Sequence, residues 1–274
     1  MSEHKISITH PDVRDIPVLE QLWMDVFGDS PELIEAFFDV FPPMVYGWIV
    51  CDGPEILTSA YLLHGNLMLR DGEITPAAYV YAVATPEVHR GKGYAGLLMR
   101  HFANLAKERS LLLYTHPAED SLYSWYKKTM LAAPTGGAEQ TLIRRTESAA
   151  QLPQLSRLTA EQYGVLRERN LQARQHIVLS DSFLRLQEHF LHDNGGGFFA
   201  AGNCCVAIDR TEHNILIKEL LGPEAEKTSA IQSALNAMDA EHAILTAYNT
   251  QGKPQIAFTS ECPIGDADWG LLLD

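Results

Sequence analysis

The sequence has few cysteines, no long apolar run and a shortage of basic side chains. Its four cysteines form no Cys-x-x-Cys pair, and the adjacent Cys204 and Cys205 lie in an apolar stretch, so we expect buried thiols and no metal site. No run approaches the roughly 20 apolar residues of a membrane helix, and no apolar segment follows the first residues as in a secretory signal. These absences predict a cytoplasmic protein with no membrane partner.

The charge balance also narrows the class of ligand. The 274 residues carry 35 acidic and 21 basic side chains, a formal net charge of −14. Nucleic-acid binding needs a basic surface, so we expect no nucleic acid as a partner. The acidic balance favours a cationic small molecule, although it is equally typical of acidic cytosolic proteins in general.

The first half of the chain alternates helical and strand-like patterns. Apolar spacing predicts two helices before the first long strands, and Asp-Gly turns between those strands predict antiparallel hairpins. A glycine turn then opens a third helix, which is followed by a short apolar strand, a helix and a last strand. The expected strands are 5–9, 46–51, 55–69, 74–85, 111–114 and 141–143, and the expected helices are 16–26, 31–41, 94–109 and 117–130.

The second half follows a polar link at 144–154 and echoes the order of the first. Its patterns predict helices near 157–168, 181–192 and 225–239, and strands at 198–208, 214–220, 243–248 and 255–260. It lacks a counterpart of the glycine turn. The length suits two modest domains. We therefore expect one domain over 1–146 and a degenerate copy over 155–274.

The glycine turn runs from the end of an apolar strand at Val83 to Gly96, at the mouth of a helix. A helix start offers unpaired N–H groups and the positive end of a dipole, so the turn predicts a phosphate site. A P-loop would place Ser or Thr after Lys92, where this chain has Gly93. The glycine spacing fits a dinucleotide fingerprint, but a hairpin meander precedes it and no acidic residue follows about 20 residues on.

The string Arg90-Gly91-Lys92-Gly93-Tyr94-Ala95 resembles the Arg/Gln-x-x-Gly-x-Gly/Ala signature of the GNAT superfamily of N-acetyltransferases. The segment 117–128 resembles a second family segment that ends in Phe-Tyr-Glu-Lys-Leu-Gly-Phe. The tandem order is similar to the enhanced-intracellular-survival branch, but without its C-terminal sterol-carrier-like domain. Two departures are that Pro86 lies four residues before Arg90, where many members have proline three before, and that no Gly-Phe follows Tyr126.

This resemblance implies a mixed, largely antiparallel α/β sheet flanked by helices, the acyl-CoA N-acyltransferase fold, and acetyl-CoA as the acetyl donor, with no metal. The pyrophosphate would lie over the amides of the turn, where glycine removes the Cβ atoms that would hold it away. Backbone groups of the preceding strand would pair with the pantetheine arm and the acetyl carbonyl. The implied donor-binding residues are Val83, Ala84, Thr85, Arg90, Gly91, Lys92, Gly93, Tyr94, Ala95 and Gly96.

Tyr126 is the implied general acid, because a phenol is protonated at neutral pH and can protonate a leaving thiolate. Its alternative is a packed core aromatic, and Tyr123, one turn earlier, is the fallback. The base stays open. A water relay is one choice, and the terminal carboxylate of Asp274 is another that the resemblance suggests; the remaining candidates are His64, His116, Glu119 and Asp120.

We therefore expect acetyl transfer to a primary amine of a small molecule or peptide, with a homo-oligomer left open. Aromatic residues in the first two helices, Trp23, Phe37, Phe38 and Phe41, suit an amphipathic or cationic amine, although ordinary core packing is the stronger explanation of them. Two other functions stay open: a non-catalytic acyl-CoA-binding sensor or interaction protein, and a tandem aminoacyl transferase. The second would bind tRNA, which the net charge of −14 opposes.

Overall fold

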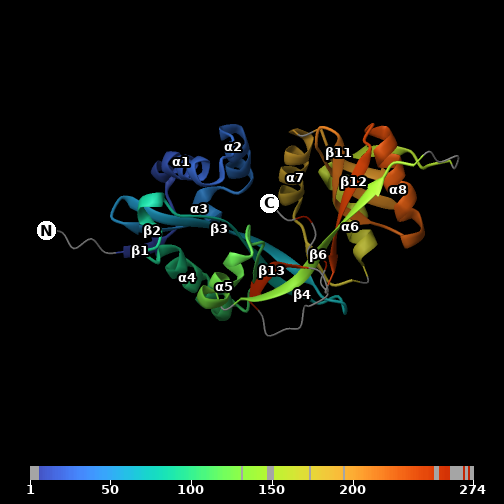
Figure 1. Ribbon diagram of the computed structural model, residues 1–274. Helices are drawn as coiled ribbons and strands as arrows, with labels where there is room; N and C mark the ends of the chain where they lie inside the picture. Colours follow the sequence, from blue (N-terminus) through green and yellow to red (C-terminus); the bar gives the residue numbers. More distant parts are fainter. Residues whose placement is uncertain are drawn as a thin grey trace.

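The computed structural model describes residues 6–130, 132–146, 151–172, 174–193, 195–249 and 253–259, with Asp268 and Leu271. Two α/β halves lie side by side, and the long strand β6 runs between them (Figure 1). The elements of the first half are β1 (Ile6–Thr9), α1 (Ile16–Phe27), α2 (Pro31–Val40), α3 (Pro43–Tyr46), β2 (Gly47–Asp52), β3 (Glu55–Met68), β4 (Ile74–Ala84), α4 (Tyr94–Arg109), β5 (Leu112–Thr115), α5 (Ser121–Thr129) and β6 (Ala133–Arg144). Those of the second half are β7 (Leu155–Leu158), α6 (Ala160–Leu171), β8 (His176–Val178), α7 (Asp181–Asp193), β9 (Gly197–Ala201), β10 (Cys204–Arg210), β11 (Asn214–Leu221), α8 (Glu224–Ala237), β12 (His242–Asn249) and β13 (Lys253–Thr259).

Local sequence signals explain where the first helices begin and end. Gly28 ends α1 in the left-handed region, with φ of 77°. Ser30 caps α2, because its hydroxyl accepts a hydrogen bond from the backbone N–H of Leu33, and Pro31 occupies the first helical turn. The short link between the helices therefore has a defined shape.

The strands form one sheet in the order β1-β2-β3-β4-β5-β13-β6-β12-β11-β10-β9-β7, with β8 paired to β3. The first four strands are antiparallel, whereas β4 and β5 are parallel because α4 connects them. Strand β13, from the far end of the chain, lies between β5 and β6 and pairs with both. The red strand among the green ones in Figure 1 marks this position. The domain boundaries at 146 and 155 stay a prediction, but the sheet crosses them at β13.

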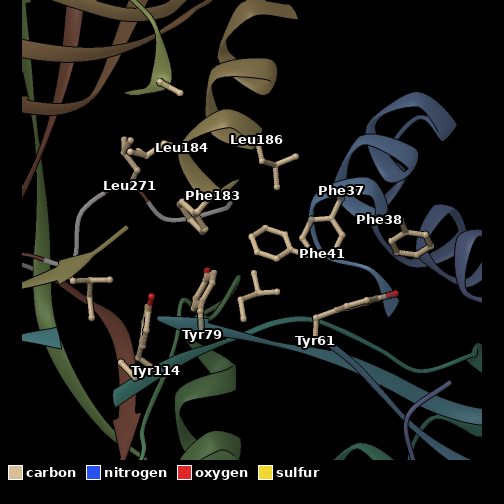
Figure 2. Packing of buried hydrophobic residues seen from close by; sticks show 14 of the residues in the cluster. Phe37, Phe38, Phe41, Tyr61, Tyr79, Tyr114, Phe183, Leu184, Leu186 and Leu271 are labelled. Atoms are coloured by element: carbon tan, nitrogen blue, oxygen red, sulfur yellow. The ribbon is translucent and has the colours of Figure 1, made fainter. Parts of the chain in front are cut away.

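Two apolar layers cover the two faces of the first half. On one face, α4 and α5 pack through Leu98, Phe102 and Tyr126. On the other, α1, α2 and α7 form an aromatic cluster with Tyr61 and Tyr79 of the sheet. Figure 2 shows this second layer: Phe37 of α2 and Phe41, which follows α2, lie over the sheet tyrosines, and Phe183 of α7 approaches from the second half. A single core thus joins the halves.

The structure corrects several sequence expectations. The single strand expected at 198–208 is wrong, because β9 and β10 form a hairpin that turns at Gly202, where φ is +61°. The strands β7 and β8 and the helix α3 were not expected, since three or four residues are too short to show a period. The strand expected at 141–143 is longer and begins at Ala133.

The cysteines Cys51, Cys204 and Cys205 are buried free thiols, while Cys262 lies outside the described residues. Within the described ranges, no helix combines the length and apolar character needed to cross a bilayer. The same ranges contain no cluster of three or more His, Cys, Asp or Glu side chains placed to hold a metal.

Candidate active site

The strands β4 and β5 separate to form a cleft. They pair only where Ala77–Tyr79 lie beside Leu112–Tyr114. Beyond that point a cavity of about 670 Å³ opens between them. We call this cavity the first cleft. It is lined by β4, by the residues after β5, by α5 and by the end of α1. It therefore reaches side chains on both faces of the sheet.

A bulge shapes the β4 wall of the first cleft. The register with β3 shifts so that Ala84 faces Ser59 and Tyr81 faces Tyr61, which leaves one extra residue on β4. Ala82 has φ of +47°, a left-handed conformation that costs a non-glycine residue about 1–2 kcal/mol. Such strain at a cleft wall is typical of a functional position. Val83, which follows it, lines the cleft and has no partner in the β3 register.

The glycine turn connects β4 to α4. Gly91 and Gly93 have φ of +75° and +88°, and a Cβ at either position would meet no described atom within 4 Å. Gly93 is the N-cap of α4 and supplies no side-chain cap, so the first amides of α4 have no acceptor from it. The turn thus presents backbone to open space at the positive end of a helix, as the sequence predicts.

Side chains in and beside the glycine turn form hydrogen bonds that hold the turn in place. The Arg90 Nε donates to the carbonyl of Thr85 at 3.1 Å, which ties the turn to the end of β4. The Thr58 hydroxyl donates to the Ala84 carbonyl at 2.7 Å and hydrogen-bonds the Thr85 hydroxyl at 2.8 Å. Lys92 is exposed, whereas Tyr94 and Ala95 are half-buried. Binding roles for these residues stay predictions.

Gly96 has a packing role that the glycine spacing alone does not reveal. It is buried, and a Cβ there would lie 3.3 Å from Cγ2 of Thr129 on α5. The absence of a side chain lets α4 and α5 approach closely, and α5 carries Tyr126. Gly96 therefore sets the distance between the glycine turn and the candidate acid.

Tyr126 lies in the wall of the first cleft and is only 5% exposed. Burial raises the pKa of its hydroxyl, and a hydrogen bond with Thr115 partly lowers it. Thr115 in turn donates to the carbonyl of Val80 at 2.9 Å. The phenol therefore stays protonated at neutral pH. Tyr123 lines the same cleft but is half-buried, and burial raises the pKa of its hydroxyl as well.

The structure separates the candidate bases. His116 and Asp120 line the first cleft. Glu119 is exposed beside them and does not line it, and Asp274 lies outside the described residues. His64 lines a different, small cavity near Phe183, and burial lowers the pKa of its imidazole. The base stays open between His116, Asp120 and water, and the terminal carboxylate of Asp274 stays an untested candidate.

Three lining residues, at the end of α1 and just after it, form one side of the first cleft. Trp23 and Phe27 form an apolar wall, and the Trp23 indole N–H donates to Oδ2 of Asp29 at 2.8 Å. Of the aromatic residues expected on the acceptor side, Trp23 lines the cleft, while Phe37, Phe38 and Phe41 belong to the core. Asp29 was missed, although the Gly28–Pro31 break between two amphipathic helices marks a loop that a sheet cleft can use.

The fold and the cleft define an α/β acyltransferase class, and comparisons specify it. Residues 10–127 match the family model described as an acetyltransferase (GNAT) domain. This part of the chain is therefore similar to a GNAT acetyltransferase domain. No curated protein sequence matches the chain.

Solved structures share the fold over both halves. A GCN5-related N-acetyltransferase from Kribbella flavida has a TM-score of 0.72 at 14% identity, and the match covers 93% of this chain and 70% of that one. Eis1 from Mycobacterium abscessus has 0.66 at 14% identity, over 90% and 66% of the two chains. A putative acetyltransferase from Pyrococcus horikoshii has 0.63 at 11% identity, over 100% and 96%. The second half is therefore part of the same overall fold.

Proposed function

We propose that the protein transfers an acetyl group from acetyl-CoA to a primary amine of a small molecule or peptide. The observation that carries the proposal is the position of Tyr126, buried in the wall of the first cleft and hydrogen-bonded to Thr115. The GNAT match over residues 10–127 supports acyl transfer, and the cleft supports the choice of residues.

The glycine turn fits the pyrophosphate of the donor. The space above Gly91 and Gly93 is open in the described structure, so a phosphate can approach their amides without meeting a Cβ. Exposed Lys92 adds a positive charge next to this space. The guanidinium of Arg90 supports the turn through Thr85 and leaves its terminal nitrogens for a phosphate.

The bulged strand fits the thioester end of the donor. Val83 has no partner in the β3 register, and β5 pairs with β4 only as far as Tyr79. These features support hydrogen bonds from backbone groups of Ala82 and Val83 to the pantetheine arm and the acetyl oxygen. An N–H held at that oxygen stabilises the developing negative charge, an effect typically worth about 3 kcal/mol.

Tyr126 completes the reaction by donating a proton. The amine nitrogen bonds to the acetyl carbon as the carbon–sulfur bond breaks, and the departing sulfur takes the proton of the Tyr126 hydroxyl. Thr115 holds the phenol, and the proton released by the amine leaves through His116, Asp120 or water. The raised pKa of Tyr126 keeps it in the donating form at neutral pH.

The acceptor side of the first cleft fits a cationic amine with an apolar part. The carboxylates of Asp29 and Asp120 lie in its wall together with Trp23 and Phe27. A protein of net charge −14 attracts cations from a distance. A cytoplasmic location and a possible homo-oligomer stay predictions from the sequence.

The test is release of free thiol from acetyl-CoA with panels of polyamines, aminoglycosides, amino acids and peptides. We expect turnover with at least one amine and a loss of about 10²–10⁴ in kcat for Tyr126→Phe. Tyr123→Phe is the matched control, from the same helix and cleft, and keeps most activity. Full turnover in Tyr126→Phe would contradict the acid assignment.

Two other functions predict different outcomes in the same assay. An acyl-CoA sensor binds CoA, seen as a shift in melting temperature, without acetylating any amine in the panel. A tandem aminoacyl transferase requires tRNA for activity, and its binding would show as an electrophoretic shift. The tyrosine in the first cleft favours acetyl transfer over both.

A further inference from the structure

The start of β3 holds the approach to the glycine turn from inside the protein. Thr58 of β3 is completely buried, and its hydroxyl donates to the carbonyl of Ala84, the last residue of β4, at 2.7 Å. A hydroxyl has a single proton to donate. The second contact of Thr58, at 2.8 Å to the hydroxyl of Thr85, must therefore use the proton of Thr85. The Thr85 hydroxyl thus donates into the protein interior.

The backbone of Thr85 is engaged on its other side. Its carbonyl accepts from the Nε of Arg90 at 3.1 Å. Thr85 therefore connects the buried Thr58 to the exposed Arg90 through two successive hydrogen bonds. We call Thr58, Thr85 and Arg90 the brace. Because the brace uses only the Nε of the guanidinium, the terminal nitrogens of Arg90 keep their protons for another acceptor.

The side chain of Thr85 does work that the sheet does not do at this point. The last pair of the β3–β4 register joins Ser59 to Ala84, so Thr85 lies just beyond the ladder. Its hydrogen bond to Thr58 extends the attachment to β3 by one residue. The carbonyl that receives the Arg90 Nε is fixed in position as a result.

A fixed Nε matters because of the shape of the guanidinium. Its N–H groups form a rigid planar fork, which binds a phosphate well only when the plane is correctly oriented. An exposed arginine such as Arg90 otherwise samples many rotamers, and that freedom is lost on binding. Holding the Nε in advance lowers this loss, so a braced arginine binds a phosphate more tightly than a free one.

A second link between β3 and the turn does not replace the brace. The Nε2 of His89 lies 2.9 Å from the carboxylate of Glu55, at the start of β3. The Glu55 side chain is 61% exposed, so the pair is weak. It also holds the residue before Arg90 and not the guanidinium. The orientation of Arg90 therefore depends on Thr85.

We propose that Thr58 and Thr85 are positioning residues that orient the guanidinium of Arg90 toward a phosphate of the donor. This inference rests on the proposed function, since it takes the glycine turn as the site of the donor's phosphates. The two hydroxyls act through Arg90, because their protons go to Ala84 and to each other. Donor affinity thus depends on a buried threonine of β3 that lies behind the turn.

The test measures the affinity for coenzyme A by calorimetric titration of the full-length protein. Thr85→Val keeps the branched shape of the side chain and removes its hydroxyl, and it should weaken binding about three- to tenfold. Thr85→Ser returns the hydroxyl and should restore the affinity. Thr75→Val is the matched control: it is the same substitution, also at a half-buried residue, about 30 Å away along β4. It should leave the affinity unchanged.

A substitution cycle shows whether the hydroxyl acts through Arg90. Thr85→Val should cause no further loss of affinity in the Arg90→Met background, because the guanidinium that it orients is gone. Thr58→Val should reproduce the loss caused by Thr85→Val. Thr85 is only half-buried, so Thr85→Val tests the brace even where Thr58→Val lowers the folding stability.

The outcomes separate this inference from the proposed function. Wild-type affinity in Thr85→Val, or an equal loss in the wild-type and Arg90→Met backgrounds, would overturn the brace and leave the donor site standing. A loss in Thr75→Val as large as that in Thr85→Val would also overturn it. Failure of the wild-type protein to bind coenzyme A would overturn the proposed donor, and the inference with it.

Discussion

Thr115 of β5 lies beside Tyr126 of α5, whose pKa this contact lowers, and the Thr115 hydroxyl donates to the carbonyl of Val80 at 2.9 Å. Thr115 also pairs with Ala257 of β13. The candidate acid is therefore held by a strand whose outer neighbour comes from the last part of the chain. Strand β13 of the second half therefore supports the strand that carries Thr115.

The pair predicts that Thr115 acts through Tyr126 as a positioning residue. Thr115→Val should lower kcat about tenfold with little change in the KM for acetyl-CoA, because an unheld phenol is less often aligned with the sulfur. It should also cost about 1–3 kcal/mol of unfolding free energy, since the buried Val80 carbonyl loses its donor. Kinetics and urea denaturation measure the two effects.

A double-substitution cycle is the control for this prediction. If Thr115 works only through the phenol, Thr115→Val should have no further effect on kcat in the Tyr126→Phe background. Equal kcat losses in the two backgrounds would show that Thr115 acts on something else. The stability loss should persist in both, because it belongs to Val80.

Replacing Gly93 should weaken donor binding more than backbone strain alone would. Gly93→Ala forces a Cβ onto a residue with φ of +88° and places that Cβ where the phosphate would approach, so coenzyme A should bind at least tenfold more weakly. Gly72→Ala is a matched control, with φ of +87° and equally open space, in the β3–β4 turn. Both should lose about 1–2 kcal/mol of stability.

Calorimetric titration with coenzyme A separates strain from binding. Only Gly93→Ala should change the affinity. If the two variants bind coenzyme A equally well, the turn is not the phosphate site. If both lose affinity in step with stability, the effect is global.

The sequence predicts elements whose patterns are local and misses elements that depend on contacts between residues distant in sequence. The glycine turn, the amphipathic helices and the Asp-Gly hairpins are local, and α1, β3, β4 and α4 lie where their periods indicate. The position of β13 between β5 and β6 comes from a contact across more than 100 residues, and no local pattern specifies it. The same holds for β8, three residues that become a strand only beside β3.

The site shows the same division. Tyr126 and the glycine turn have motifs, whereas Asp29 reaches the first cleft only because α1 ends beside the diverging strands. Gly96 was interpreted by its spacing, but the partner that explains its burial, Thr129, lies in another helix. Residues whose role depends on a neighbour distant in sequence give no signal in one sequence.

The buried pair of Arg167 and Glu219 should be essential to the second half. Both side chains are almost fully buried, and the Arg167 Nε lies 3.0 Å from the Glu219 carboxylate. Arg167→Met should destabilise the protein by about 3–5 kcal/mol, because it leaves a carboxylate buried without its cation. Arg145→Met, which breaks the exposed pair with Asp239, should cost at most about 1 kcal/mol.

The double variant Arg167→Met, Glu219→Met tests whether the stability loss in Arg167→Met comes from the unpaired Glu219 carboxylate. Since it removes both charges, it should recover much of the stability lost in Arg167→Met. Denaturation in urea measures all three variants. A double variant that is less stable than Arg167→Met would mean that Glu219 has a second essential partner, beyond the Tyr163 hydroxyl that it accepts from.

His176 should make folding stability depend on pH near neutrality. Its Nε2 lies 2.9 Å from the Glu168 carboxylate and its Nδ1 lies 2.7 Å from the Arg174 carbonyl. Both partners are acceptors, so the geometry fits the doubly protonated ring. Burial lowers the pKa of His176, but the hydrogen bonds to Glu168 and Arg174 raise it by more than burial lowers it, so the net shift of the pKa is upward.

A raised folded-state pKa means that the stabilisation is fully present below the unfolded value of about 6.5 and is lost as pH rises through the folded value. The difference in unfolding free energy between wild type and His176→Gln should therefore shrink from pH 6 towards pH 9. A wild-type advantage over His176→Gln that grows with pH would show that the ring is neutral in the fold, with its two nitrogens bonded differently from the arrangement described above.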